Sequence, residues 1–119
     1  MLLSTVRDIL DADVLCGEDK LNTEVLSACG SDFMSDVLSF VKNQAVLLTG
    51  LVNPQVIRTA DTMDMKCVVF VRGKRPSAHM LTLAEERGMV VMATTQPMYP
   101  ACGKLYMGGL ELAHQKTAE

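Results

Sequence analysis

The chain has 119 residues, 49% of them hydrophobic and 21% charged, which suits a single domain over residues 1–119 better than two independent cores. Its formal net charge is -3 and it has no long run of Lys or Arg, so it lacks the basic surface with which proteins bind nucleic acid. No segment approaches the roughly 18 consecutive apolar residues that cross a bilayer, so we expect no membrane association and, by default, a cytoplasmic location.

The first 30 residues alternate short apolar runs with polar turns. Ser4 is expected to cap a helix that ends near Leu10, because its hydroxyl can accept hydrogen bonds from backbone N–H groups of the first turn. Two short strands should follow, over residues 13–16 and 24–29. Since this region patterns differently from the rest, we expect it to add an edge hairpin or an antiparallel strand to the sheet.

A helix is predicted after Gly30. Ser31 and Asp32 can cap its first turn, and apolar residues then recur at the spacing of one helical face. The helix dipole would favour the carboxylates of Asp32 and Asp36 there, and a catalytic base at either position is the weaker interpretation. The expected apolar face consists of Met34, Val37, Leu38 and Val41.

Three apolar segments follow, and each leads through a short polar break into a helix. Asn53-Pro54 supplies an N-cap and a proline at the first helical position, Ser77 begins the next helix, and Gly88 can end it. The strands are expected over residues 45–48, 67–71 and 89–93. The last helix should begin between residues 95 and 100 and end at Gly108-Gly109. The tail over residues 113–119 is expected to be frayed. The side chains expected to face the core are Val56, Ile57, Ala60, Met63, Met80, Leu83, Ala84, Met98, Cys102, Leu105 and Tyr106.

Strands as apolar as these cannot expose a face to water, so they predict a mainly parallel sheet with helices on both sides. The expected fold class is therefore α/β, a three-layer domain with right-handed crossovers. The carboxyl ends of parallel strands meet at one edge of the sheet. Open α/β sheets usually bind their ligands at that edge.

Small, polar or basic residues follow all three apolar strands and should meet at that edge. Arg72 would pair with an anion, the glycines would allow close approach of the backbone, and the threonine hydroxyls would hydrogen-bond the ligand. The alternatives are strand termination, helix capping and an ordinary solvated loop that carries Arg72, Lys74 and Arg75. The candidate ligand-binding residues are Thr49, Gly50, Arg72, Gly73, Thr94 and Thr95.

Catalytic and metal-binding patterns are weak in this sequence. The four cysteines include no C-x-x-C pair and are interpreted as buried thiols without a disulfide. His79 and His114 have no obvious Cys or carboxylate partner, so solvated side chains are expected. The chain contains no G-x-x-x-x-G-K-[ST] loop for transfer of a phosphoryl group from ATP. We therefore expect no catalytic residues, no metal and no cofactor.

Three segments follow one another as Val46-Leu47-Leu48-Thr49-Gly50, then Val68-Val69-Phe70-Val71-Arg72-Gly73-Lys74-Arg75-Pro76-Ser77, then Leu83-Ala84-Glu85-Glu86-Arg87-Gly88-Met89-Val90-Val91. In pattern and order, nearly the whole chain resembles the DRTGG domain, which is similar to the N-terminal domain of bacterial HPr kinase/phosphorylase. Leu51-Val52 stands where that family has Asp-Arg, and Val71-Arg72-Gly73 stands where it has Thr-Gly-Gly.

The resemblance implies a regulatory or ligand-sensing module that is usually dimeric. The leading hypothesis is a noncatalytic bacterial domain that binds a small anionic metabolite or a nucleotide and acts as a homodimer or through a larger protein partner. The alternative is a structural adaptor, in which an apolar helix face docks a partner protein and no small-molecule site exists. The abundance of Met in the helices is compatible with this alternative.

Overall fold

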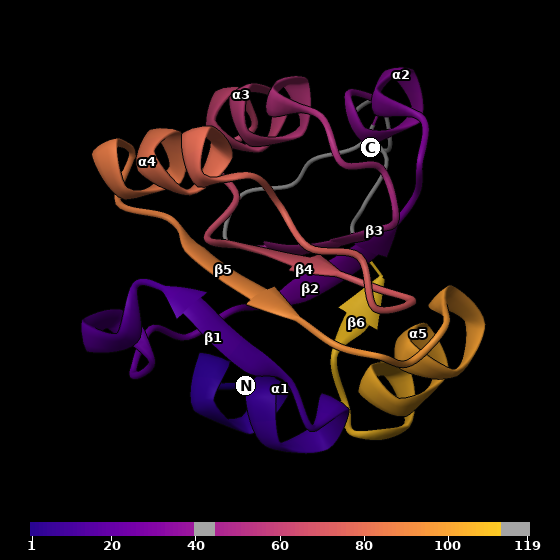
Figure 1. Cartoon of the computed structure of the whole chain (residues 1–119). Coiled ribbons are helices and arrows are strands. Elements are labelled where there is room, and N and C mark those ends of the chain that lie inside the picture. The colour runs from indigo at the N-terminus through magenta and orange to yellow at the C-terminus, as the bar shows by residue number, and fades with distance from the viewer. Residues whose placement is uncertain (40–44, 113–119) are drawn as a thin grey trace.

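The computed structural model describes residues 1–39 and 45–112, and side chains up to residue 110. Its elements form one six-stranded sheet with helices on both faces (Figure 1). In chain order they are α1 (Leu3–Leu10), β1 (Asp13–Cys16), the 3-10 helix η1 (Glu18–Lys20), β2 (Ser27–Gly30), α2 (Met34–Val37), β3 (Ala45–Thr49), α3 (Pro54–Thr62), β4 (Cys67–Phe70), α4 (Ala78–Glu86), β5 (Val90–Ala93), α5 (Met98–Met107) and β6 (Glu111–Leu112).

The sheet has the strand order β1-β5-β4-β3-β2-β6. Strands β2 to β5 are consecutive in the chain and pair in parallel, and β6 pairs in parallel with β2 at one edge. β1 is antiparallel to β5 and forms the other edge. The predicted mainly parallel sheet is confirmed, and the N-terminal region supplies the expected antiparallel strand.

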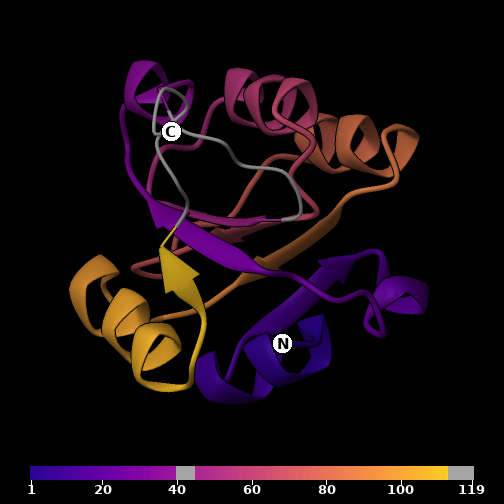
Figure 2. The same cartoon turned by 180° about the vertical axis from the view of Figure 1, so that it is seen from behind.

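The helices form a layer on each face of the sheet. α2, α3 and α4 cover one face, and α1 and α5 cover the other (Figure 1, Figure 2). The chain after β4 therefore turns to one face, into α4, while the chain after β5 turns to the other, into α5. A change of face between neighbouring parallel strands opens a crevice at their carboxyl ends.

Each central strand contributes to a core on both sides of the sheet, because successive side chains point to opposite faces. In β3, Ala45 and Leu47 pack with α2, α3 and α4, whereas Val46 and Leu48 pack with α1 and α5. Every residue of β3, β4 and β5 is buried. This burial on both faces explains why the strands are continuous apolar runs and not alternating ones.

The predicted starts of two helices are confirmed. Asn53 precedes α3, and its side-chain oxygen accepts the backbone N–H two residues on at 2.8 Å, with Pro54 at the first helical position. Ser77 precedes α4, and its Oγ accepts the N–H three residues on at 3.3 Å. Gly88 follows α4 with φ of 68°, the left-handed conformation expected there.

Most side chains predicted to face the core do so. Tyr106 does not, because 69% of it is exposed, and Ala101 takes the buried position on α5 instead. The buried members of the predicted set are Val56, Ile57, Ala60, Met80, Ala84 and Leu105, and the half-buried ones are Met63, Leu83, Met98 and Cys102.

The predicted cap at Ser4 is wrong. Helix α1 begins at Leu3, so Ser4 lies inside its first turn, and no side chain caps the helix. The N–H groups of Leu3 and Ser4 donate instead to the carbonyl oxygens of Thr23 and Leu21, each at 3.0 Å. Since the neighbouring backbone satisfies these donors, the helix needs no capping hydroxyl. The strand predicted from residue 24 also starts later, at the beginning of β2.

The helix predicted after Gly30 is shorter than expected. α2 has only four residues, its N-cap residue is Phe33, and neither Ser31 nor Asp32 caps it. Asp32 is unavailable as a cap because its carboxylate is hydrogen-bonded to the loop after β3. Val41, the last residue of the predicted apolar face, lies outside the described residues, as does the predicted frayed tail.

The cysteines fit the expectation of buried thiols only in part. Cys16 and Cys67 are buried and Cys29 and Cys102 are half-buried, and none forms a disulfide. Burial raises the pKa of the Cys67 and Cys16 thiols above the usual value.

Over the described ranges, no helix combines the length and apolar character needed to cross a bilayer.

Replacing Asn53 with Ala should destabilise the domain by about 1 kcal/mol, because the first turn of α3 loses its capping oxygen. Asn53→Asp keeps that oxygen and serves as the control. Urea denaturation followed by circular dichroism measures both variants, and equal stability of Asn53→Ala and the original protein would show that the cap contributes nothing.

Candidate functional site

The loops that follow β3, β4 and β5 lie side by side at the carboxyl edge of the sheet. Backbone hydrogen bonds join them, since the N–H of Val71 donates to the carbonyl of Thr49 at 3.0 Å and the N–H of Gly73 donates to the carbonyl of Thr94 at 2.9 Å. All the candidate residues named from the sequence therefore lie along one edge. Parallel pairing of the three strands places them there.

Arg72 and Gly73 form the centre of a tight turn. The N–H of Lys74 donates to the carbonyl of Val71 at 3.1 Å, and φ is 59° at Arg72 and 73° at Gly73. For an L residue such as arginine, the left-handed conformation costs about 1–2 kcal/mol. Residues held in this conformation occur preferentially at ligand sites. A Cβ at Gly73 would meet nothing within 4 Å, so the space above the turn is open.

The guanidinium of Arg72 lies over Gly50. A Cβ added to Gly50 would come within 2.5 Å of Nη2 and 3.2 Å of Nε of Arg72. The close approach predicted at Gly50 is therefore made by Arg72 of the same chain. Among the described residues, Arg72 has no ion-pair partner, whereas Arg75 three positions later pairs with Asp13. The basic loop thus offers one arginine that is already neutralised and one that is not.

Asp32 belongs to this site, although it was interpreted as a helix cap. One carboxylate oxygen, Oδ1, accepts the N–H of Gly50 at 2.7 Å and the hydroxyl of Thr49 at 3.0 Å. The Thr49 hydroxyl in turn accepts the N–H of Leu51 at 3.1 Å. The polar groups of Thr49 and Gly50 are therefore engaged within the protein and shape the loop.

The strand register indicates that Asp32 lies at this site. β2 and β3 are parallel, with Gly30 opposite Leu48, so continuing the register by two residues places Asp32 beside Gly50. The sequence alone does not show which strands are neighbours or how they align. For that reason the local pattern of a helix start was the stronger indication.

The two threonines after β5 differ in their surroundings. Thr94 is buried, and its hydroxyl donates to the carbonyl of Leu10 at 2.8 Å, which ties the end of β5 to the end of α1. Thr95 is exposed. It lines a small pocket of about 90 Å³ whose other lining residues are Asp11, Asp13, Gly73, Arg75, Ala93 and Thr94. Because Asp13 holds Arg75 there, this pocket carries less positive charge than the sequence suggests.

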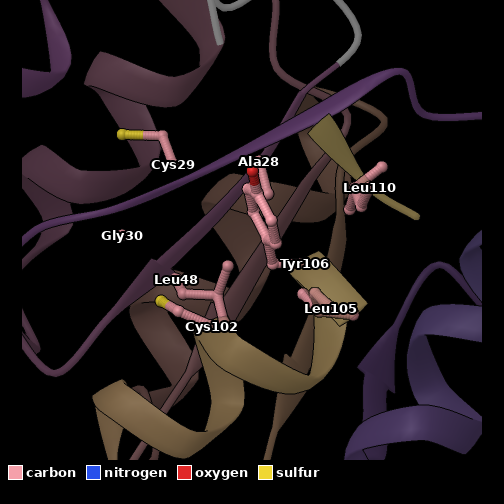
Figure 3. Close-up of a pocket in the computed structure, with 8 residues that line it drawn as sticks. All are labelled: Ala28, Cys29, Gly30, Leu48, Cys102, Leu105, Tyr106 and Leu110. Carbon is pink, nitrogen blue, oxygen red and sulfur yellow. The ribbon is translucent and has the colours of Figure 1, made fainter. Parts of the chain in front are cut away.

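A second pocket, of about 140 Å³, lies between β2 and α5 and is mainly apolar (Figure 3). Its lining residues are Ala28, Cys29, Gly30, Leu48, Cys102, Leu105, Tyr106 and Leu110. The side chains of Cys29 and Cys102 pack on opposite faces of the sheet. Burial, and then the nearby Cys29, raise the pKa of the Cys102 thiol, which favours its neutral form.

The described part of the chain contains no group of three or more His, Cys, Asp or Glu residues placed to hold a metal ion. His79 lies on the exposed side of α4. His114 lies outside the described residues. Neither histidine is therefore assigned a role in the site.

Thr49→Val should destabilise the domain by about 1–3 kcal/mol, because the partly buried Leu51 N–H and the Asp32 carboxylate lose a partner while the volume is kept. Thr49→Ser retains the hydroxyl and should lose less. Chemical denaturation gives both values. A valine variant as stable as the original protein would mean that this hydroxyl does not support the loop.

Comparison with known proteins identifies a family. A model of the DRTGG domain matches residues 5–105. Among solved structures, the chain is similar to the CBS and DRTGG domains of the regulatory region of Clostridium perfringens pyrophosphatase, complexed with the activator diadenosine tetraphosphate, with a TM-score of 0.70 and 14% identity. The match covers 98% of this chain and 51% of that one, so the chain spans about half the length of that structure.

A search of curated proteins finds no match. The model match extends over most of the chain, and the fold agrees with a solved structure that contains a DRTGG domain. The chain belongs to the DRTGG domain family.

Proposed function

We propose that this chain is a noncatalytic, ligand-sensing regulatory domain that binds a small phosphate-bearing anion, such as a nucleotide, at the carboxyl edge of its sheet. The observation that carries the proposal is the guanidinium of Arg72. It is held over Gly50 by a left-handed backbone turn and has no ion-pair partner among the described residues. A guanidinium presents paired N–H donors that match phosphate oxygens.

The surroundings of Arg72 support an anion more than they support catalysis. The open space above Gly73 lets a ligand reach the backbone of the turn, and Thr95 offers an exposed hydroxyl on the neighbouring loop. Asp32, whose carboxylate also lies beside Gly50, accepts two hydrogen bonds and is held as part of the loop. Thr49, Gly50 and Thr94 act in this proposal by positioning the loops.

The similar pyrophosphatase region supports a nucleotide as the type of ligand, because it is a regulatory region complexed with diadenosine tetraphosphate. When this domain binds its ligand, the activity of an associated protein would change. Each bound ligand would stabilise the folded domain in proportion to its affinity, which makes thermal stability a direct readout.

The test is calorimetric titration and thermal shift with AMP, ADP, diadenosine tetraphosphate and inorganic phosphate. At least one should bind, and Arg72→Gln should weaken its binding about tenfold or more, since a charge-assisted hydrogen bond is lost. Lys74→Gln, an exposed cation two residues away, should have a much smaller effect. Failure of every probe to bind, or an equal loss in the two variants, would contradict the proposal.

Gly50→Ala tests the position of the guanidinium and not only its charge. The three atoms nearest to the added Cβ all belong to the Arg72 side chain, namely Nη2 at 2.5 Å, Nε at 3.2 Å and Cζ at 3.3 Å, and none of them is a backbone atom. We therefore expect the domain to remain folded while the guanidinium moves and ligand affinity falls. Thermal unfolding without ligand checks the first expectation, and titration of the same sample checks the second.

Helix α5 supports a second part of the proposal, a homodimer. Its exposed side includes Tyr99, Tyr106 and Met107, which are 90%, 69% and 86% exposed, and Gly103, above which a Cβ would meet nothing. Of these residues, Tyr106 also lines the apolar pocket together with Cys102. A two-fold axis would place the protruding side chains of each copy against the pocket of the other.

Light scattering after size exclusion tests this arrangement. The original chain should be a dimer, and Tyr106→Glu should make it a monomer because a charge would be buried at the interface. Phe33→Glu, at an exposed apolar residue next to α2 on the opposite face, should leave the dimer intact. A monomer at all concentrations would contradict the homodimer and favour the adaptor alternative, in which a different protein covers α5.

A further inference from the structure

Asp32 and Arg72 approach Gly50 closely but do not form an ion pair with each other. Oδ1 of Asp32 lies 2.7 Å from the Gly50 nitrogen, and Nη2 of Arg72 would lie 2.5 Å from a Cβ at the same residue. Arg7, Arg75 and Arg87 each pair with a carboxylate in the described structure. At this site a carboxylate and a guanidinium both lie beside Gly50, and neither forms an ion pair among the described residues.

The two oxygens of the Asp32 carboxylate have different roles. Oδ1 takes both hydrogen bonds from the protein, one from the Gly50 N–H and one from the Thr49 hydroxyl. Among the described residues, none donates to Oδ2. The carboxylate is therefore fixed in orientation through one oxygen and presents the other, with its lone pairs, on an exposed side chain.

We propose that Oδ2 of Asp32 accepts a hydrogen bond from a sugar hydroxyl of the ligand whose phosphate is bound by Arg72. The ligand class is thereby a phosphorylated sugar, such as the ribose phosphate of a nucleotide. This inference rests on the proposed function and adds to it the group that the carboxylate recognises. A phosphate alone would be repelled by Asp32, whereas a ligand with a hydroxyl donor beside its phosphate satisfies both charged groups.

Asp32→Asn is the informative variant, because an amide keeps one oxygen to accept from Gly50 and Thr49 but removes the charge and replaces the second acceptor by a donor. Calorimetric titration compares AMP with 2′,3′-dideoxy-AMP, which lacks both ribose hydroxyls. In the original protein, loss of the hydroxyls should weaken binding about tenfold to a hundredfold, as expected for hydrogen bonds to a charged group.

In Asp32→Asn the same two ligands should bind within about threefold of each other, since the hydroxyls have lost their charged acceptor. Asp36→Asn, an exposed carboxylate four residues further on, is the control and should keep the full difference. Thermal unfolding of each variant without ligand verifies that the loop is retained. If Asp32 only holds the loop, the ratio of the affinities for AMP and 2′,3′-dideoxy-AMP should be the same in Asp32→Asn as in the original protein.

The outcomes separate this inference from the proposed function. If AMP binds and depends on Arg72, but the hydroxyls matter equally in the original protein and in Asp32→Asn, the inference is overturned and the proposed function stands. If neither AMP nor any other phosphate probe binds, both are overturned. Binding of glycine or another amino acid that is lost in both the Asp32 and Arg72 variants, without AMP binding, would assign Asp32 to an ammonium group and overturn the hydroxyl assignment.

Discussion

The parallel pairing of β2, β3, β4 and β5 is the constraint on which the rest of the structure depends. Parallel neighbours cannot be joined by tight hairpins, so each connection passes over a face of the sheet. With helices on both faces, β3, β4 and β5 are buried at every position and are almost wholly apolar. The same pairing aligns the carboxyl ends of the strands, where the connecting loops can carry polar groups without burying them.

Most polar groups at that edge connect one loop to another. The Thr49 hydroxyl links the end of β3 to Asp32, and the Thr94 hydroxyl links the end of β5 to α1. A buried hydroxyl without a partner would cost free energy, so these hydroxyls form hydrogen bonds within the protein. Arg72 differs, because its exposed guanidinium is positioned by Gly50 and by the turn beneath it. The fold thus supplies a frame for Arg72, which forms no ion pair among the described residues.

Local patterns predicted the elements whose causes are local. Asn53-Pro54 and Ser77 start helices because their side chains and ring act on the adjacent turn, and the apolar runs become strands. The prediction failed at Ser4 and Asp32, where distant groups decide. The backbone near Thr23 replaces the cap at Ser4, and the loop at Gly50 captures the Asp32 carboxylate. In both cases a long-range partner displaced the short-range one that the sequence indicated.

The sequence by itself determined the α/β class, the repeated strand and helix units, the edge at which their loops gather and the resemblance to the DRTGG domain, because each follows from hydrophobic periodicity, local turn chemistry or the order of segments. The tertiary structure decided which polar residues bond within the protein and which do not. It joined Asp13 to Arg75, brought Asp32 beside Gly50 and left Arg72 without an ion-pair partner among the described residues. These pairings depend on strand order and register, which bring together residues that no local pattern connects.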